Sequence, residues 1–139
     1  MNFGLAQYLS NDLTLKTFEI QSYSDKISDF FKDKQYGDGL KDISIGIICV
    51  SPEYEIFFKP RKPKFTKFKE EKIDGLVVVY DHVFECDVCL SYELFKKANT
   101  NEVHKIIAKE LVNVIDMLKL KKIENFDIDQ FQRDFEAII

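Results

Sequence analysis

The residues most able to do chemistry lie close together near the middle of the chain. Cys86 and Cys89 have the CxxC spacing found in many zinc and redox sites, and the nearest further zinc ligands are Cys49 and His82. The stretch around the two cysteines alternates apolar and polar residues as a strand does, and strand positions three apart point to opposite faces. A redox pair also uses a helix N-terminus to lower its thiol pKa. We therefore expect Cys86 to be a small core residue, and we expect no metal ion and no other cofactor.

Two carboxylates share the other face of the same strand. Glu85 and Asp87 are same-face neighbours, with Asp81 as a third candidate. Paired carboxylates can act as acid and base or hold a metal, and they can form an acidic contact surface for a basic partner. We favour a solvated polar sheet face. His82 and His104 are far apart, and no GxSxG elbow, HExxH motif or glycine-rich phosphate loop accompanies them. No catalytic residue is predicted, and we expect a protein that is not an enzyme.

The most distinctive segment is basic and spans residues 59–72, with the sequence KPRKPKFTKFKEEK. It contains seven basic and two acidic residues, whereas the chain before it has a net charge of −4 and the chain after it −5. Charge separated in this way predicts a surface with two faces of opposite sign. The candidate partner-binding residues are the cations Lys59, Arg61, Lys62, Lys64 and Lys67, together with Glu85 and Asp87 of the acidic strand face.

Three interpretations of the basic segment stay open. Pro60 and Pro63 limit it to a loop or an edge strand, and lysines and prolines are what proteins place on an exposed edge to prevent edge-to-edge pairing. The segment could also be a surface for a protein partner. It could also grip nucleic-acid phosphates, with Phe65 and Phe68 as stacking platforms for bases.

The elements that would position these residues begin with a strand predicted over residues 16–21. A helix is expected to follow it, starting at Ser22 or Ser24 and ending at Gly37 and Gly39. On that helix, apolar residues recur at helical spacing and would form one buried face.

The centre of the chain predicts three strands. Residues 43–50, ISIGIICV, form a nearly continuous apolar run, which indicates a central strand covered on both faces. Gly46 within it suggests a bulge or a close approach by another backbone. Further strands are expected over residues 76–80 and 84–92, and Asp81-His82 between them is either a hairpin turn or a bulge.

The last third of the chain predicts two helices. Asn99 with Glu102, and Asp127 with Gln130, have the spacing of N-terminal capping pairs, and apolar stripes follow both. With strands first and helices last, we expect an α+β fold: a small, mostly antiparallel sheet with helices packed on one face.

The bulk properties favour one soluble domain over residues 1–139. The chain is 45% hydrophobic and 32% charged, which excludes a disordered chain, and its net charge of −4 argues against bulk nucleic-acid binding. The first residues lack a secretory signal, and no run approaches the roughly 20 apolar residues that span a bilayer. Three cysteines, an odd number, favour the reducing cytoplasm.

Several stretches resemble small immunity proteins of bacterial polymorphic-toxin systems. The matching pieces are ICVSPEY at 48–54, FKPRKPKFTK at 58–67, LSYELFKKA at 90–98 and FDIDQFQRD at 126–134. The resemblance implies an intracellular protein that binds and neutralises a cognate toxin domain, by covering its active site or by holding it inactive. The alternative is a small nucleic-acid-binding accessory domain that uses residues 59–68. The sequence indicates no membrane partner and leaves the oligomeric state open.

Overall fold

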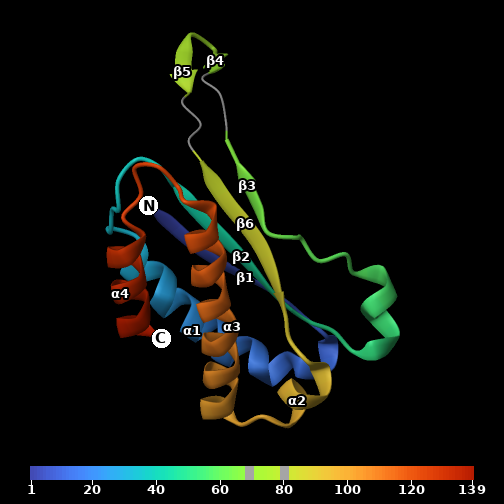
Figure 1. The fold of residues 1–139 in the computed structure, drawn as a ribbon. Helices are drawn as coiled ribbons and strands as arrows, with labels where there is room; N and C mark the ends of the chain where they lie inside the picture. Colours follow the sequence, from blue (N-terminus) through green and yellow to red (C-terminus); the bar gives the residue numbers. More distant parts are fainter. Residues whose placement is uncertain (68–70, 79–81) are drawn as a thin grey trace.

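The computed structural model describes residues 1–67, 71–78 and 82–139 (Figure 1). Two short 3-10 helices are labelled η. In chain order the elements are β1 (Asn2–Leu9), η1 (Asn11–Leu13), α1 (Thr14–Phe31), β2 (Asp42–Cys49), η2 (Pro52–Phe57), β3 (Lys64–Thr66), β4 (Glu71–Ile73), β5 (Leu76–Val78), β6 (Val83–Cys89), α2 (Tyr92–Lys97), α3 (Thr100–Lys121) and α4 (Ile128–Ile138).

The main sheet has the strand order β1-β2-β6-β3, and helices α1, α3 and α4 lie together on one of its faces (Figure 1). The fold is α+β as expected, but a mostly antiparallel sheet is wrong. Strands β1, β2 and β6 are parallel, and only β3 runs antiparallel, against β6. The reason is that α1 connects β1 to β2 as a crossover, and a long connection containing η2 leads from β2 to β6.

The prediction of a strand over residues 16–21 is also wrong, because this stretch lies inside α1. Ile20, Ile27 and Phe31 recur at helical spacing and are fully buried, and this packing outweighs the local β preference of the residues. The helix ends at Phe31, before Gly37 and Gly39. Those glycines instead let their loop lie against the loop that precedes α4, where the Gly39 amide donates to the Asn125 carbonyl oxygen at 2.8 Å.

The central strand is present as predicted. In β2, Ile43, Ile45 and Ile47 are at most 1% exposed and belong to the core. On the opposite face Gly46 and Ile48 are buried, whereas Asp42 and Ser44 are partly exposed, so the strand is covered on both faces only along its second half.

In β6, Phe84, Cys86 and Val88 point into the core while Glu85 and Asp87 lie on the other face, which confirms the predicted alternation over these residues. The predicted extension of the strand to residue 92 is wrong, because β6 ends at Cys89 and Tyr92 begins α2. Strands β2 and β6 place the polar side chains of the sheet away from the helices.

The helical side of the core is rich in phenylalanine. The Phe31 ring lies 5.0 Å from Phe3 of β1 and 5.2 Å from Phe131 of α4, centroid to centroid. The two predicted caps are confirmed: Asn99 accepts from the Glu102 amide at 3.0 Å, and Asp127 accepts from the Gln130 amide at 3.1 Å. Within the described residues, none of the helices is long and apolar enough to cross a membrane.

Strands β4 and β5 form a two-stranded sheet of their own. They are joined at Asp74-Gly75, whose φ angles of 49° and 81° are those of a tight hairpin turn. The predicted strand over 76–80 is therefore present as β5 over 76–78, and its last two residues lie outside the described part of the chain. The choice between a turn and a bulge at Asp81-His82 also stays open, because Asp81 lies outside the described residues.

Candidate protein-binding surface

The acidic strand face and the basic segment, which the sequence presents as two separate candidate surfaces, meet at one edge of the sheet. Strand β3 pairs with β6 so that Lys64 lies directly opposite Glu85. Arg61 and Lys64 are three positions apart, whereas Glu85 and Asp87, whose amide donates to the Arg61 carbonyl oxygen, are two positions apart. The extra residue on the basic strand is what a β-bulge inserts, and Pro63, which has no amide hydrogen, lies within it. The basic segment is thus an edge strand preceded by an irregular stretch.

Asp87 attaches this stretch to the sheet. Its carboxylate accepts from the Arg61 backbone amide at 2.5 Å and from Arg61 Nε at 3.0 Å, and its own amide donates to the Arg61 carbonyl oxygen at 3.0 Å. The side chain of Asp87 is 5% exposed, so this is a sheltered, charge-assisted pair. Gly46 of β2 lies beneath it, because a Cβ atom there would collide with Asp87 Oδ1. The predicted alternatives for Gly46, a bulge or a close approach by another backbone, are both wrong: the pairing is regular through Gly46, and the group that approaches it closely is the Asp87 side chain.

These contacts leave little free acidic surface. Glu85, 39% exposed, lies 3.9 Å from Arg61 Nη1 and opposite Lys64. The lysines of the segment are different: Lys59, Lys62, Lys64 and Lys67 are exposed, and no ion pair is found for them among the described residues. We call Lys59, Arg61, Lys62, Lys64 and Lys67 the basic edge. Its free charge is positive, in a chain that is acidic as a whole.

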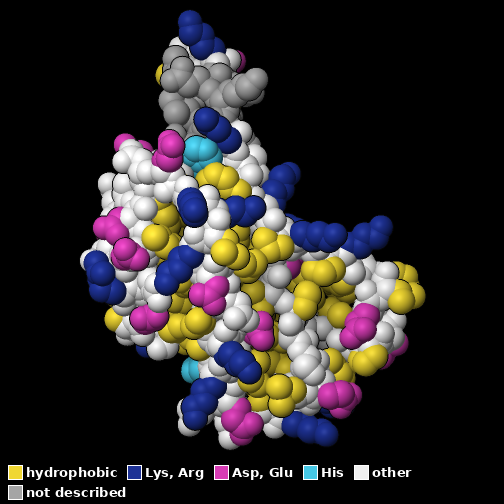
Figure 2. Space-filling view, viewed as in Figure 1, with side chains coloured by type: hydrophobic (Ala, Val, Ile, Leu, Met, Phe, Trp, Pro, Cys, Tyr) yellow, Lys and Arg dark blue, Asp and Glu magenta, His cyan; other side chains and the backbone are white. Residues whose placement is uncertain are grey.

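An exposed apolar turn adjoins the basic edge, and sequence analysis did not identify it. We define the apolar turn as Tyr54, Ile56, Phe57 and Phe58, which are 53%, 81%, 74% and 40% exposed. Figure 2 shows hydrophobic side chains gathered over η2, with lysine and arginine side chains beside them. The signal was available, since four large apolar residues follow the strand-ending Ser51-Pro52 within six positions. An exposed apolar patch bordered by charge is typical of a protein interaction site.

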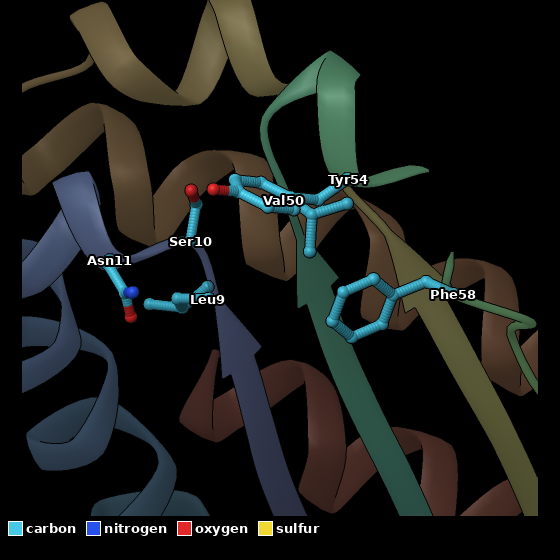
Figure 3. A pocket seen from close by; sticks show the side chains of 6 residues that line it. All are labelled: Leu9, Ser10, Asn11, Val50, Tyr54 and Phe58. Carbon is cyan, nitrogen blue, oxygen red and sulfur yellow. The ribbon is translucent and has the colours of Figure 1, made fainter. Parts of the chain in front are cut away.

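The apolar turn folds back over the ends of β1 and β2 and leaves a small cavity beneath it. This cavity, of about 180 Å³, is lined by Leu9, Ser10, Asn11, Val50, Tyr54 and Phe58 (Figure 3). A second cavity of about 190 Å³ shares Val50 and Phe58 and extends toward Cys89. Each has room for one or two side chains, which is less than the 300–1,000 Å³ typical of sites for small-molecule ligands.

The cysteines and histidines do not converge on a reactive centre. Cys86 is buried in the core and Cys89 is exposed on the opposite face, as expected for strand positions three apart. Burial raises the pKa of Cys49 and of Cys86 to about 11, which disfavours the reactive thiolate. Within the described ranges, no group of three or more His, Cys, Asp or Glu residues is arranged to hold a metal ion.

Both histidines pack against aromatic rings. The His104 ring stacks on Tyr23 between α3 and α1, with centroids 4.5 Å apart, and the His82 ring stacks on Phe65 at 4.8 Å. Phe65 is partly buried against the core, so a nucleic-acid base would have to compete with His82 for its ring. Phe68, the other proposed stacking platform, lies outside the described residues.

The family model for Immunity protein 44 matches residues 1–139, which is the whole chain. The chain belongs to the Immunity protein 44 family. This confirms the resemblance to bacterial toxin immunity proteins that the sequence suggested. No curated protein and no solved structure matches the chain.

Membership of the Immunity protein 44 family fits the geometry of the site. Among the described residues, the feature that stands out is an exposed surface. That surface is made of the basic edge and the apolar turn, which the connection from β2 to β6 carries at one side of the sheet.

Proposed function

We propose that this protein binds a cognate bacterial toxin domain and neutralises it without catalysing a reaction, through the basic edge and the apolar turn together. The observation that carries the proposal is the position of free lysines beside an exposed apolar turn in a member of an immunity family. We place this binding in the cytoplasm, where the three free thiols would stay reduced.

The charges favour the basic edge over the acidic strand face as the contact region. Asp87 is sheltered and paired with Arg61, so it offers almost no charge to a partner, and Glu85 is flanked by Arg61 and Lys64. Lys59, Lys62 and Lys64 are exposed, and no ion pair is found for them among the described residues, so their charges are open to a partner. The toxin surface that fits them is acidic, with apolar side chains that contact the apolar turn.

Each half of the surface has a separate role in this proposal. Exposed charges mainly steer encounter and set the association rate, whereas desolvated apolar anchors near the centre of an interface mainly set the dissociation rate. We therefore assign steering to Lys59 and Lys62, and anchoring to Ile56 and Phe57, which are more than 70% exposed and available to be buried. Covering the toxin in this way requires no reactive group on the immunity protein.

The first test is co-purification from the native bacterium with a tagged chain, at low and at high salt. We expect a stoichiometric polypeptide that ends in a small toxin domain, and we expect the chain to abolish the activity of that domain. Recovery of nucleic acid alone, lost as salt is raised, would contradict the proposal and favour the nucleic-acid-binding alternative.

The second test measures binding kinetics with the toxin domain so identified. The double variant Lys59→Glu, Lys62→Glu should slow association about tenfold or more at low salt, and the difference should shrink at high salt. The matched control is Lys105→Glu, Lys109→Glu, which makes the same charge change at exposed positions of α3. Equal association rates for the two double variants would refute the assignment of steering to the basic edge.

The third test addresses the apolar turn. Ile56→Ser and Phe57→Ser should each raise the dissociation rate about tenfold while leaving the association rate within about threefold. Leu120→Ser is the control, because Leu120 is 82% exposed on α3. If Ile56→Ser and Phe57→Ser behave like Leu120→Ser, the apolar turn is not the anchor.

A further inference from the structure

The other edge of the main sheet is formed by β1, and its outer side is unpaired. The Asn2 amide donates to the Lys41 carbonyl oxygen, just before β2, and the Ser10 amide donates to the Cys49 carbonyl oxygen at the end of β2. The even-numbered residues of β1 therefore point their backbone N–H and C=O groups at β2. Because strand residues alternate in direction, Phe3, Leu5, Gln7 and Leu9 point their backbone groups outward. Among the described residues, none of the hydrogen bonds outside the ladder uses those outward groups.

This edge also lacks the features that usually keep strands apart. Proteins protect exposed edges with short strands, bulges, prolines and charges, especially lysine. Strand β1 has eight residues, NFGLAQYL, with no proline and no charged side chain. Its outward backbone groups are therefore a template for another strand.

We propose that β1 is a self-association surface, on which the β1 strand of a second copy of this chain pairs antiparallel to join two sheets into one. The absence of charge suits a copy of itself, because a two-fold axis places each residue near its equivalent and would set like charges against each other.

The sequence of β1 selects one register. Only one antiparallel register pairs all four outward residues with outward residues of the copy: Phe3 with Leu9, and Leu5 with Gln7. On the face away from the helices, this register places Tyr8 of each copy opposite Gly4 of the other, and Ala6 opposite Ala6 on the two-fold axis. Tyr8 is 50% exposed, and around Gly4 the nearest atom to an added Cβ is 4.0 Å away, so each Tyr8 ring meets a position with free space. The large and small residues of the strand are complementary to their own copy.

Helix α1 extends the same surface. The Gln7 side-chain amide donates to the Thr17 carbonyl oxygen at 3.2 Å and to Gln21 Oε1 at 3.0 Å, so α1 packs over β1 on the helix-bearing face of the sheet. The next residue on the helix, Phe18, is 73% exposed. Pairing of the two β1 strands brings the two α1 helices toward each other and adds apolar area to the strand contact. One strand pair with this support is smaller than a standard interface of roughly 1,600 Å², so we expect a reversible, concentration-dependent dimer.

The test is sedimentation equilibrium of the purified full chain across a wide concentration range, with single variants at the two-fold axis. Ala6→Lys places two like charges in direct opposition and should weaken dimerisation about tenfold or more. The matched control is Ala137→Lys, the same substitution at an exposed alanine of α4, which should leave dimerisation unchanged. Since Ala6 is exposed in one copy, circular dichroism and urea unfolding should show Ala6→Lys to be folded.

A complementation experiment keeps the proposal falsifiable and tests the register. Ala6→Glu alone should also weaken the dimer, whereas an equal mixture of Ala6→Lys and Ala6→Glu chains should restore a dimer containing one of each, because Lys then faces Glu. A chain that stays monomeric at all concentrations overturns the proposal, and so does a dimer that Ala6→Lys does not weaken. A monomer whose Ala6→Lys variant loses toxin binding would assign β1 to the toxin instead, and it also overturns the proposal.

Discussion

The two edges of the main sheet differ in strand length, in charge and in the regularity of the backbone. Strand β3 is three residues long, contains Lys64 and is flanked by further exposed lysines. Two prolines precede it, and the Asp87–Arg61 pair holds the preceding stretch to β6. The β1 edge is eight residues long, uncharged and free of proline. Charge and irregular backbone on β3 suit a partner of different sequence, met by steering. The regular backbone and uncharged side chains of β1 allow it to pair with an identical strand. Because the edges are opposite, pairing through β1 would leave the basic edge of each copy open to the proposed toxin partner.

The largest expected effect comes from breaking the attachment of the β3 edge at Gly46. In Gly46→Val the new side chain would occupy the position of the Asp87 carboxylate, so that Asp87 and Arg61 separate and the basic edge loses its fixed position. We expect a loss of about 2–3 kcal/mol in the free energy of unfolding, as is typical of overpacking. Urea denaturation measures the stability, and hydrogen exchange at the Arg61 and Asp87 amides reports the detachment.

Gly4→Ala is the control for this prediction, measured at concentrations where the chain is monomeric. Gly4 lies on the same face of the neighbouring strand, and an added Cβ there has only the Ile43 carbonyl oxygen near it, at 4.0 Å. We expect a change within about 0.5 kcal/mol. Equal losses in the free energy of unfolding for the Gly4 and Gly46 variants would mean that the absence of a side chain at Gly46 is not what allows the Asp87–Arg61 pair to form.

A smaller effect is expected when the anchoring carboxylate itself is removed. Asp87→Ala leaves the Arg61 backbone amide and guanidinium without their acceptor, while Arg61, 40% exposed, can still reach water. We expect a loss of about 1–2 kcal/mol in the free energy of unfolding. Proteolysis should then cleave the chain near Arg61 faster than in the parent protein.

The matched variant is Glu85→Ala. Glu85 is on the same strand and face, but it is 39% exposed and lies 3.9 Å from Arg61 Nη1. Its removal should cost less than about 0.5 kcal/mol and leave the cleavage rate unchanged. If Glu85→Ala lowered the free energy of unfolding as much as Asp87→Ala does, the basic edge would be held to β6 by the total negative charge of the strand face and not by the Asp87–Arg61 pair.

The sequence predicts what depends on near neighbours. The alternation of β6, the continuous apolar run of β2 and the caps at Asn99 and Asp127 are local patterns, and all of them are confirmed. Gly46 also carried a local signal, since a glycine inside an apolar strand indicates a close approach, here by the Asp87 side chain and not by a backbone.

What the sequence does not predict depends on distant partners or on exposed apolar residues. Phe18 is 73% exposed on α1, so it falls outside the helical stripe and makes residues 16–21 resemble a strand. Strand β1 contains no β-branched residue, so its composition does not indicate a strand. Its strand conformation depends on pairing with β2, which lies some 40 positions later in the sequence. The Asp87–Arg61 pair joins residues 26 positions apart, so two surfaces that the sequence keeps separate become one.

The smallest effect is expected from making the β3 edge more like β1. The double variant Lys62→Thr, Lys64→Thr removes two exposed charges for which no partner is found among the described residues, so the free energy of unfolding should change by less than about 0.5 kcal/mol. We also expect no new self-association through β3, because a three-residue strand after a bulge offers few backbone groups to a copy. Sedimentation of this variant in the Ala6→Lys background, where β1 pairing is weakened, isolates the β3 edge. If that triple variant dimerises, the lysines alone prevent the β3 strands of two copies from pairing, and charge is the difference that matters between the two edges. If it stays monomeric while its association with the toxin slows, strand length keeps β3 from pairing and the lysines serve the partner.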